Sequence, residues 1–157
     1  SWNRVCRMRE WKSLIVFLVL VAGAALLGGL SAPDAWFAAL QKPSFNPPSW
    51  VFGPAWTLLY GLMAVAAWRV YRVAGLGLAI SLWGVQLVIN AIWSPLFFGL
   101  HRIDLALIDI LILDVLVMAT IVSFFRHDKL AGWLMLPYLG WIAFATVLNA
   151  AIWQLNR

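Results

Sequence analysis

The sequence has few charged residues, and long uncharged runs separate them. Only 11% of its 157 residues are charged and 64% are hydrophobic, whereas a soluble domain carries about 25% charged residues. Uncharged runs of about 20 apolar residues are long enough to cross a bilayer as helices. Lipid offers the backbone no hydrogen-bond partners, and a helix satisfies its own. The composition therefore excludes a soluble protein and predicts an integral membrane protein.

Cysteine and histidine are also scarce. Cys6 is the only cysteine, so an internal disulfide is excluded, and His101 and His127 stand alone in predicted loops. No Cys/His metal spacing and no nucleophile–base pair is present, so we expect no metal site and no catalytic residue. The net charge of +5 comes without a basic stripe or a recognition motif, which excludes nucleic acid as a partner.

The apolar runs predict a single all-α domain, residues 1–157, with five transmembrane helices. A basic start before an apolar run also describes a signal peptide, but the first run is long for that and four more follow, so we expect a retained helix. The predicted spans are residues 13–32, 50–68, 77–98, 103–125 and 130–156.

The predicted loops differ in their content of Lys and Arg. With five spans, the N-terminus and the second and fourth loops share one side of the membrane, which receives eight of the eleven basic residues. The positive-inside rule then predicts a cytoplasmic N-terminus and an external first loop. The eight are Arg4, Arg7, Arg9, Lys12, Arg69, Arg72, Arg126 and Lys129; the other three are Lys42, Arg102 and Arg157.

The first loop, residues 33–53, is the only long connection. Proline stiffens it, and long loops are often binding loops or lids. Trp36, Lys42, Phe45 and Asn46 lie within it, and we expect it to cover the mouth of a pocket. Lys42 either holds an acidic edge of a ligand or is a solvated loop residue.

Eleven tryptophans are present. An interfacial belt explains those that flank the spans, namely Trp2, Trp11, Trp68, Trp133 and Trp153. It explains less well Trp36, Trp50, Trp56, Trp93 and Trp141, most of which lie toward the predicted outer side.

Two helix faces carry amides. Trp141, Ala145 and Asn149 stand four residues apart, and small Ala145 leaves a recess between a ring and an amide. Gln86, Asn90 and Ser94 repeat this spacing. Amides in a bilayer face protein or a cavity. They therefore either bond between helices, or line a pocket that suits a flat, largely apolar ligand with polar edges.

Four segments resemble the TspO/MBR family of tryptophan-rich sensory and translocator proteins. Segments 36–48 (WFAALQKPSFNPP) and 50–60 (WVFGPAWTLLY) resemble the region of its first loop. Segments 86–99 (QLVINAIWSPLFFG) and 137–149 (PYLGWIAFATVLN) resemble its third and fifth helices. The order is the same, and the match covers nearly the whole chain.

The resemblance implies a five-helix membrane protein, often dimeric, that binds porphyrin such as protoporphyrin IX or haem beneath the first loop. It implies no covalent cofactor. Animal members carry a sterol motif with a Tyr late in the fifth helix; this Tyr is absent here, which argues against sterol as the native ligand. The positions that match the family's pocket are Trp36, Trp56, Asn90, Trp93, Trp141, Ala145 and Asn149.

Several functions remain open. The chain is a receptor, sensor or carrier for a porphyrin-like tetrapyrrole linked to tetrapyrrole regulation or stress; or a light-dependent, oxidative porphyrin-degrading enzyme; or a proton-coupled transporter; or a scaffold. In the transporter hypothesis, Asp109 or Asp114 of the fourth span carries the proton, because an acid inside the membrane is a functional candidate. Small residues Gly77, Ser81 and Gly84 on the third span either form a homodimer interface or pack inside the bundle.

Overall fold

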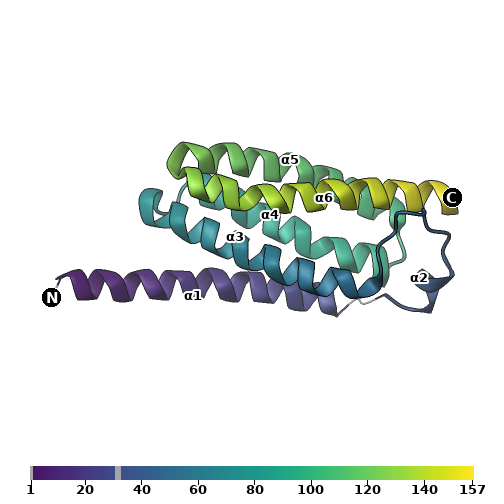
Figure 1. Cartoon of the computed structure of the whole chain (residues 1–157), viewed down its shortest axis with the longest axis horizontal. Helices are drawn as coiled ribbons and strands as arrows, with labels where there is room; N and C mark the ends of the chain where they lie inside the picture. Colours follow the sequence, from purple (N-terminus) through teal and green to yellow (C-terminus); the bar gives the residue numbers. More distant parts are fainter. Residues whose placement is uncertain (1, 31–32) are drawn as a thin grey trace.

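Five long helices lie side by side in the computed structural model, which describes residues 2–30 and 33–157, without the side chains of residues 2–10 and 49 (Figure 1). The elements are α1 (Trp2–Gly29), α2 (Ala35–Ala39), a 3₁₀ turn η1 (Ser49–Val51), α3 (Phe52–Ala74), α4 (Leu78–Ser94), a π-helical turn η2 (Pro95–Gly99), α5 (Ile103–His127) and α6 (Lys129–Asn156). The predicted all-α bundle with a long first loop is confirmed.

The five long helices form a closed ring. α1 packs on α3, α3 on α6, α6 on α5, α5 on α4, and α4 on α1. Helix α1 uses one narrow stripe, since Phe17, Val21 and Ala24 are its buried residues among those described. Phe17 meets the edges of Tyr71 and Trp83 at ring-centroid distances of 5.8 and 5.3 Å.

Four of these helices are long and apolar enough to cross a membrane: residues 11–29 of α1, α4 with η2, α5 and α6. Helix α3 has 23 residues, or roughly 35 Å of helix at 1.5 Å per residue. Its tryptophans, tyrosines and two arginines make it less apolar. It runs on to Ala74 rather than ending near Trp68, and Gly75 ends it at a positive φ of 67°, which glycine adopts without steric cost.

The α5–α6 turn is tight. Asp128 caps α6 by accepting a hydrogen bond from the Leu130 N–H (3.1 Å), and it pairs with Arg69 of α3 at 2.7 Å. A Cβ at Gly132 would lie 2.5 Å from the Phe125 ring, so the close approach of α5 and α6 requires glycine there.

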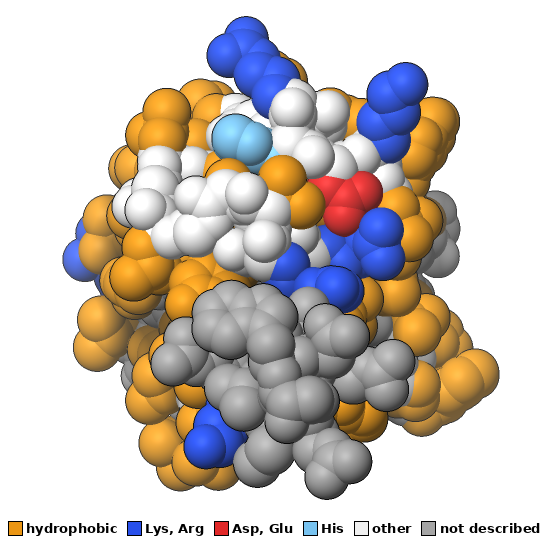
Figure 2. Space-filling model, turned by 90° about the vertical axis from the view of Figure 1, so that its left-hand side faces the viewer, with side chains coloured by type: hydrophobic (Ala, Val, Ile, Leu, Met, Phe, Trp, Pro, Cys, Tyr) orange, Lys and Arg blue, Asp and Glu red, His pale blue; other side chains and the backbone are white. Residues whose placement is uncertain are grey.

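The predicted loop sides correspond to the two ends of the bundle. The N-terminus, the α3–α4 link and the α5–α6 turn lie at one end; the first loop, the α4–α5 link and the C-terminus lie at the other (Figure 1). At the N-terminal end, Lys and Arg side chains surround an acidic group (Figure 2). There Arg69, Arg72, Val73 and Asp128 line a hollow of about 270 Å³. The predicted end of the first span at Ala32 lies outside the residues that the structure describes. So do the side chains of Trp2, Arg4, Cys6, Arg7 and Arg9.

The tryptophans divide between surface and core. Trp11 and Trp133 are exposed, as expected of a belt, and so is Trp50, at 74%. Trp83, which no pattern in the sequence singled out, is 1% exposed and is the largest fully buried side chain among those described. The bundle therefore uses indoles both at its surface and to fill its core.

Candidate functional site

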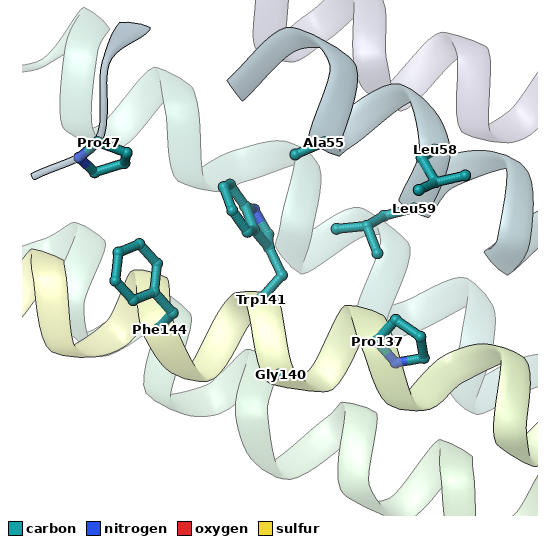
Figure 3. Close-up of a pocket in the computed structure, with 8 residues that line it drawn as sticks. All are labelled: Pro47, Ala55, Leu58, Leu59, Pro137, Gly140, Trp141 and Phe144. Carbon is teal, nitrogen blue, oxygen red and sulfur yellow. The ribbon is translucent and has the colours of Figure 1, made fainter. Parts of the chain in front are cut away.

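A groove of about 470 Å³ lies between α3 and α6. Its walls come from both helices, and Pro47 of the first loop stands at one end, near Phe144 (Figure 3). Its lining is apolar, so it suits an apolar ligand. The lining residues are Pro47, Ala55, Leu58, Leu59, Pro137, Gly140, Trp141 and Phe144.

Aromatic rings surround Trp141. Its ring meets Trp56 at 6.2 Å and Phe52 at 5.8 Å, both nearly edge to face, and Phe144 at 6.0 Å. Phe45 of the first loop packs against Phe144 at 6.2 Å. Such contacts hold rings in fixed orientations. One side of the groove is therefore a preformed aromatic wall that the first loop helps to complete.

Two buried polar atoms close to this wall have no hydrogen-bond partner among the described residues. They are the Trp141 indole Nε1–H and the Asn46 side-chain oxygen. Asn46 precedes Pro47, and its side-chain nitrogen donates only a long bond of 3.4 Å to the Pro47 carbonyl. A buried donor without a partner costs roughly 1–3 kcal/mol. A ligand acceptor at Trp141 would remove that cost.

A buried polar network holds α3, α4 and α6 together. The Tyr138 hydroxyl donates to the Gln86 side-chain oxygen (2.9 Å) and accepts from the Asn90 amide (2.6 Å). Asn90 accepts in turn from the Tyr60 hydroxyl (2.8 Å). The amides of α4 therefore bond between helices, one of the two roles that the sequence left open.

A second polar and aromatic cluster lies near the first loop. The Trp93 indole donates to the Asn149 side-chain oxygen (2.9 Å), and the Asn149 amide donates to the Ile103 carbonyl (3.1 Å). Trp93 stacks on Phe97 at 5.0 Å, and Phe97 meets Trp36 at 6.0 Å. Trp93 and Asn149 thus join α4, α5 and α6.

The structure brings together some of the residues predicted to bind ligand and separates others. Phe45, Trp56 and Trp141 meet at the groove, directly or through Phe144. Ala145 is half-buried and packs against the same hydrophobic core as Trp56 and Trp141, but it does not line the groove. The Lys42 ammonium donates to the carbonyls of Ala38 (3.3 Å) and Leu40 (3.2 Å) and lies over the Phe37 ring. Trp36, Trp93 and Asn149 belong to the second cluster.

Most of the residues that line the groove were missed from the sequence. On α6, the sequence pointed to the face of Trp141, Ala145 and Asn149, whereas the groove uses Pro137, Gly140, Trp141 and Phe144. Gly140, Trp141 and Phe144 follow Pro137 by three, four and seven residues, so the four share a stripe of one helix face. This stripe of one proline, one glycine and two aromatic residues is visible in the sequence and could have predicted the α6 side of the groove.

The acids of α5 lie outside the groove. Asp109 is buried, and one of its carboxylate oxygens has no partner among the described residues; Asp114 accepts from the Thr146 hydroxyl of α6 at 2.7 Å. Asp104 binds the Arg102 guanidinium at 2.9–3.0 Å, and this hydrogen bond, with charge attraction, raises the pKa of Arg102. Among the described residues, no three His, Cys, Asp or Glu side chains cluster closely enough to hold a metal ion.

Comparison with known proteins decides the family. The model of the TspO/MBR family matches residues 15–154. The chain belongs to the TspO/MBR family. With its long apolar helices, this family member is an integral membrane protein.

Relatives of this TspO/MBR protein come from all three domains of life. It is 42% identical to the tryptophan-rich sensory protein of Cereibacter sphaeroides over 147 residues, covering 94% of this chain and 93% of that one. It is 46% identical to the tryptophan-rich protein TspO of Archaeoglobus fulgidus, covering 78% and 81%. It is 39% identical to the human translocator protein, covering 78% and 75%.

Proposed function

We propose that this protein is a membrane receptor or sensor that binds a flat, largely apolar ligand, a porphyrin-like tetrapyrrole, in the α3–α6 groove. The observation that carries the proposal is the indole N–H of Trp141, which has no hydrogen-bond partner among the described residues and is buried beside an apolar groove of about 470 Å³. A flat macrocycle fits against an aromatic wall, and an acceptor atom on it would complete the hydrogen bonding of Trp141. The name of the sensory relative supports a receptor role.

The macrocycle's acidic edge is proposed to face the first loop. Porphyrins such as protoporphyrin IX carry propionate carboxylates, and an ammonium group has three N–H donors. Lys42 uses two of them on the Ala38 and Leu40 carbonyls. Its third N–H can donate to a carboxylate oxygen of the ligand, and Asn46 lies four residues further along the same loop.

The test is a titration of the purified protein with protoporphyrin IX, first in the dark and then under light. We expect saturable quenching of tryptophan fluorescence with an intact porphyrin spectrum, and weaker binding by Trp141→Phe, which keeps a ring but lacks the N–H. Absence of saturable quenching would contradict the proposal. Loss of the porphyrin spectrum under light, with a new product, would support the porphyrin-degrading enzyme instead.

We also propose that the N-terminus is cytoplasmic and that the first loop faces outward. The argument is the excess of Lys and Arg at the N-terminal end of the bundle. Reporter fusions at the two termini test this orientation, since only the cytoplasmic terminus gives an active cytoplasmic reporter.

A homodimer through α4 is proposed as well. Gly77 and Ser81 are exposed, and a Cβ at Gly77 or Gly84 would meet nothing within 4 Å. This face therefore leaves room for a second helix to approach closely, and small residues favour such approach in lipid.

A further inference from the structure

The groove between α3 and α6 opens on the outer surface of the helix ring. Leu58 on its rim is 65% exposed, and Pro137 and Gly140 are exposed as well. A Cβ at Gly140 would meet nothing within 4 Å, so no described side chain covers this part of the groove. In a membrane-spanning bundle, exposed apolar surface between two helices faces lipid.

The end of the groove toward the first loop is covered instead. Pro47 stands at that end, and Phe45 packs on Phe144. The loop that carries these residues is fastened to the C-terminal end of α6. The Asn156 side chain accepts from the Gln41 N–H (2.9 Å) and donates to the Gln41 carbonyl (2.8 Å).

A second fastening holds the start of the loop. The Trp36 ring stacks on His101 with centroids 4.1 Å apart and planes within 10°. Asp34 lies 3.5 Å from the same imidazole, and its other carboxylate oxygen caps α2 by accepting from the Phe37 N–H. Four prolines between residues 33 and 48 stiffen the chain between these points.

We propose that the ligand reaches the groove sideways from the bilayer, between α3 and α6, and not from water past the first loop. This rests on the proposed function and narrows its ligand class to compounds dissolved in the membrane. A hydrocarbon-lined mouth offers a ligand the same surroundings as the lipid it leaves. The aqueous route would first require the two fastenings of the loop to open.

The experiment measures rates in phosphatidylcholine vesicles with protoporphyrin IX dimethyl ester, a neutral probe that partitions into lipid, followed by tryptophan quenching. Leu58→Trp narrows the mouth, and Leu111→Trp is its matched control, because Leu111 lies on α5 and is also exposed. Asn156→Ala releases the loop. All variants are first shown to be folded by thermal unfolding.

A barrier at the mouth of the groove slows both the entry and the exit of the ligand. We expect Leu58→Trp to lower the association and dissociation rates at least fivefold each, with Kd changed less than threefold, and Leu111→Trp and Asn156→Ala to leave both rates within twofold of wild type. If Asn156→Ala speeds both rates more than fivefold while Leu58→Trp behaves like Leu111→Trp, sideways access is overturned and the groove assignment survives. If wild type shows no saturable binding at equilibrium, the proposed function is overturned, and this inference with it.

Discussion

Asn156, the last residue of α6, holds the backbone of Gln41 through both its side-chain oxygen and its side-chain nitrogen, at 2.9 and 2.8 Å. The two residues are 115 positions apart in the sequence. The side-chain amide of Asn156 thus bonds both the N–H and the carbonyl of Gln41, as the backbone of a neighbouring strand does in a sheet. This pairing ties the first loop to the far end of the chain and fixes the part of the loop that covers the groove.

Replacement of Asn156 by alanine should loosen the first loop. Two hydrogen bonds are lost, each contributing about 0.5–1.5 kcal/mol. We expect amide hydrogens around Gln41 to exchange roughly tenfold faster, measured by hydrogen–deuterium exchange with mass spectrometry. Gln154→Ala, an exposed change on the same helix, is the control. Equal exchange in both variants would mean that the loop is held by other contacts.

Replacement of Tyr138 by phenylalanine should destabilise the bundle. The hydroxyl is buried and joins Gln86 to Asn90, so its loss leaves a buried acceptor and a buried donor unsatisfied. We expect a loss of about 1–3 kcal/mol in the free energy of unfolding, measured in detergent micelles. The control is Tyr71→Phe, which removes a hydroxyl outside this network. A Tyr138→Phe protein as stable as the control would show that the network does not hold the helices.

Filling the groove should weaken ligand binding. Gly140→Leu adds a side chain to the groove lining at a position where an added Cβ meets nothing within 4 Å. We expect at least a tenfold loss of protoporphyrin IX affinity by fluorescence titration. The control is Gly23→Leu, at an exposed glycine of α1 where an added Cβ also meets nothing within 4 Å. It should change the affinity less than twofold. If Ala145→Phe abolishes binding and Gly140→Leu does not, the ligand lies in the interior recess that the sequence predicted.

Removal of the Lys42 ammonium should distinguish acidic from neutral porphyrins. The carboxylate contact is exposed in part, and such pairs contribute about 0.2–1 kcal/mol. We expect Lys42→Ala to weaken protoporphyrin IX binding about three- to fivefold and to leave the dimethyl ester within twofold. A similar loss for both ligands would instead assign Lys42 to holding α2, through its bonds to the Ala38 and Leu40 carbonyls.

A large residue on the small-residue face of α4 should reduce dimer formation. Ser81 is exposed beside Val85 and Val88, which are 50% and 58% exposed. Ser81→Phe should lower the cross-linked dimer fraction in native membranes at least threefold, because close approach of two helices depends on small side chains. Val115→Phe, on the exposed face of α5, should leave it unchanged. Monomer only in wild-type membranes would contradict the dimer itself.

The sequence by itself determined the all-α membrane architecture and the approximate helix boundaries. Length and apolarity decide which segments span, because a helix in lipid satisfies its own backbone and needs no distant partner. Glycine, proline and charged residues between the apolar runs mark the ends, which is why α5 and α6 begin within one residue of their predicted starts. The amides of α4 and α6 were found in the same way, as polar residues in apolar segments.

Only the tertiary structure decided what those amides contact and where the groove lies. Spacing along one helix shows which residues share a face, but the neighbour of that face depends on the order of helices in the ring. Tyr138 of α6 reaches across the ring to Gln86 and Asn90 of α4. Because α6 lies beside α3, Pro137, Gly140 and Phe144 face α3 across a groove. The contact of Gln41 with Asn156 arises because the first loop and the C-terminus share one end of the bundle, a proximity that no local pattern encodes.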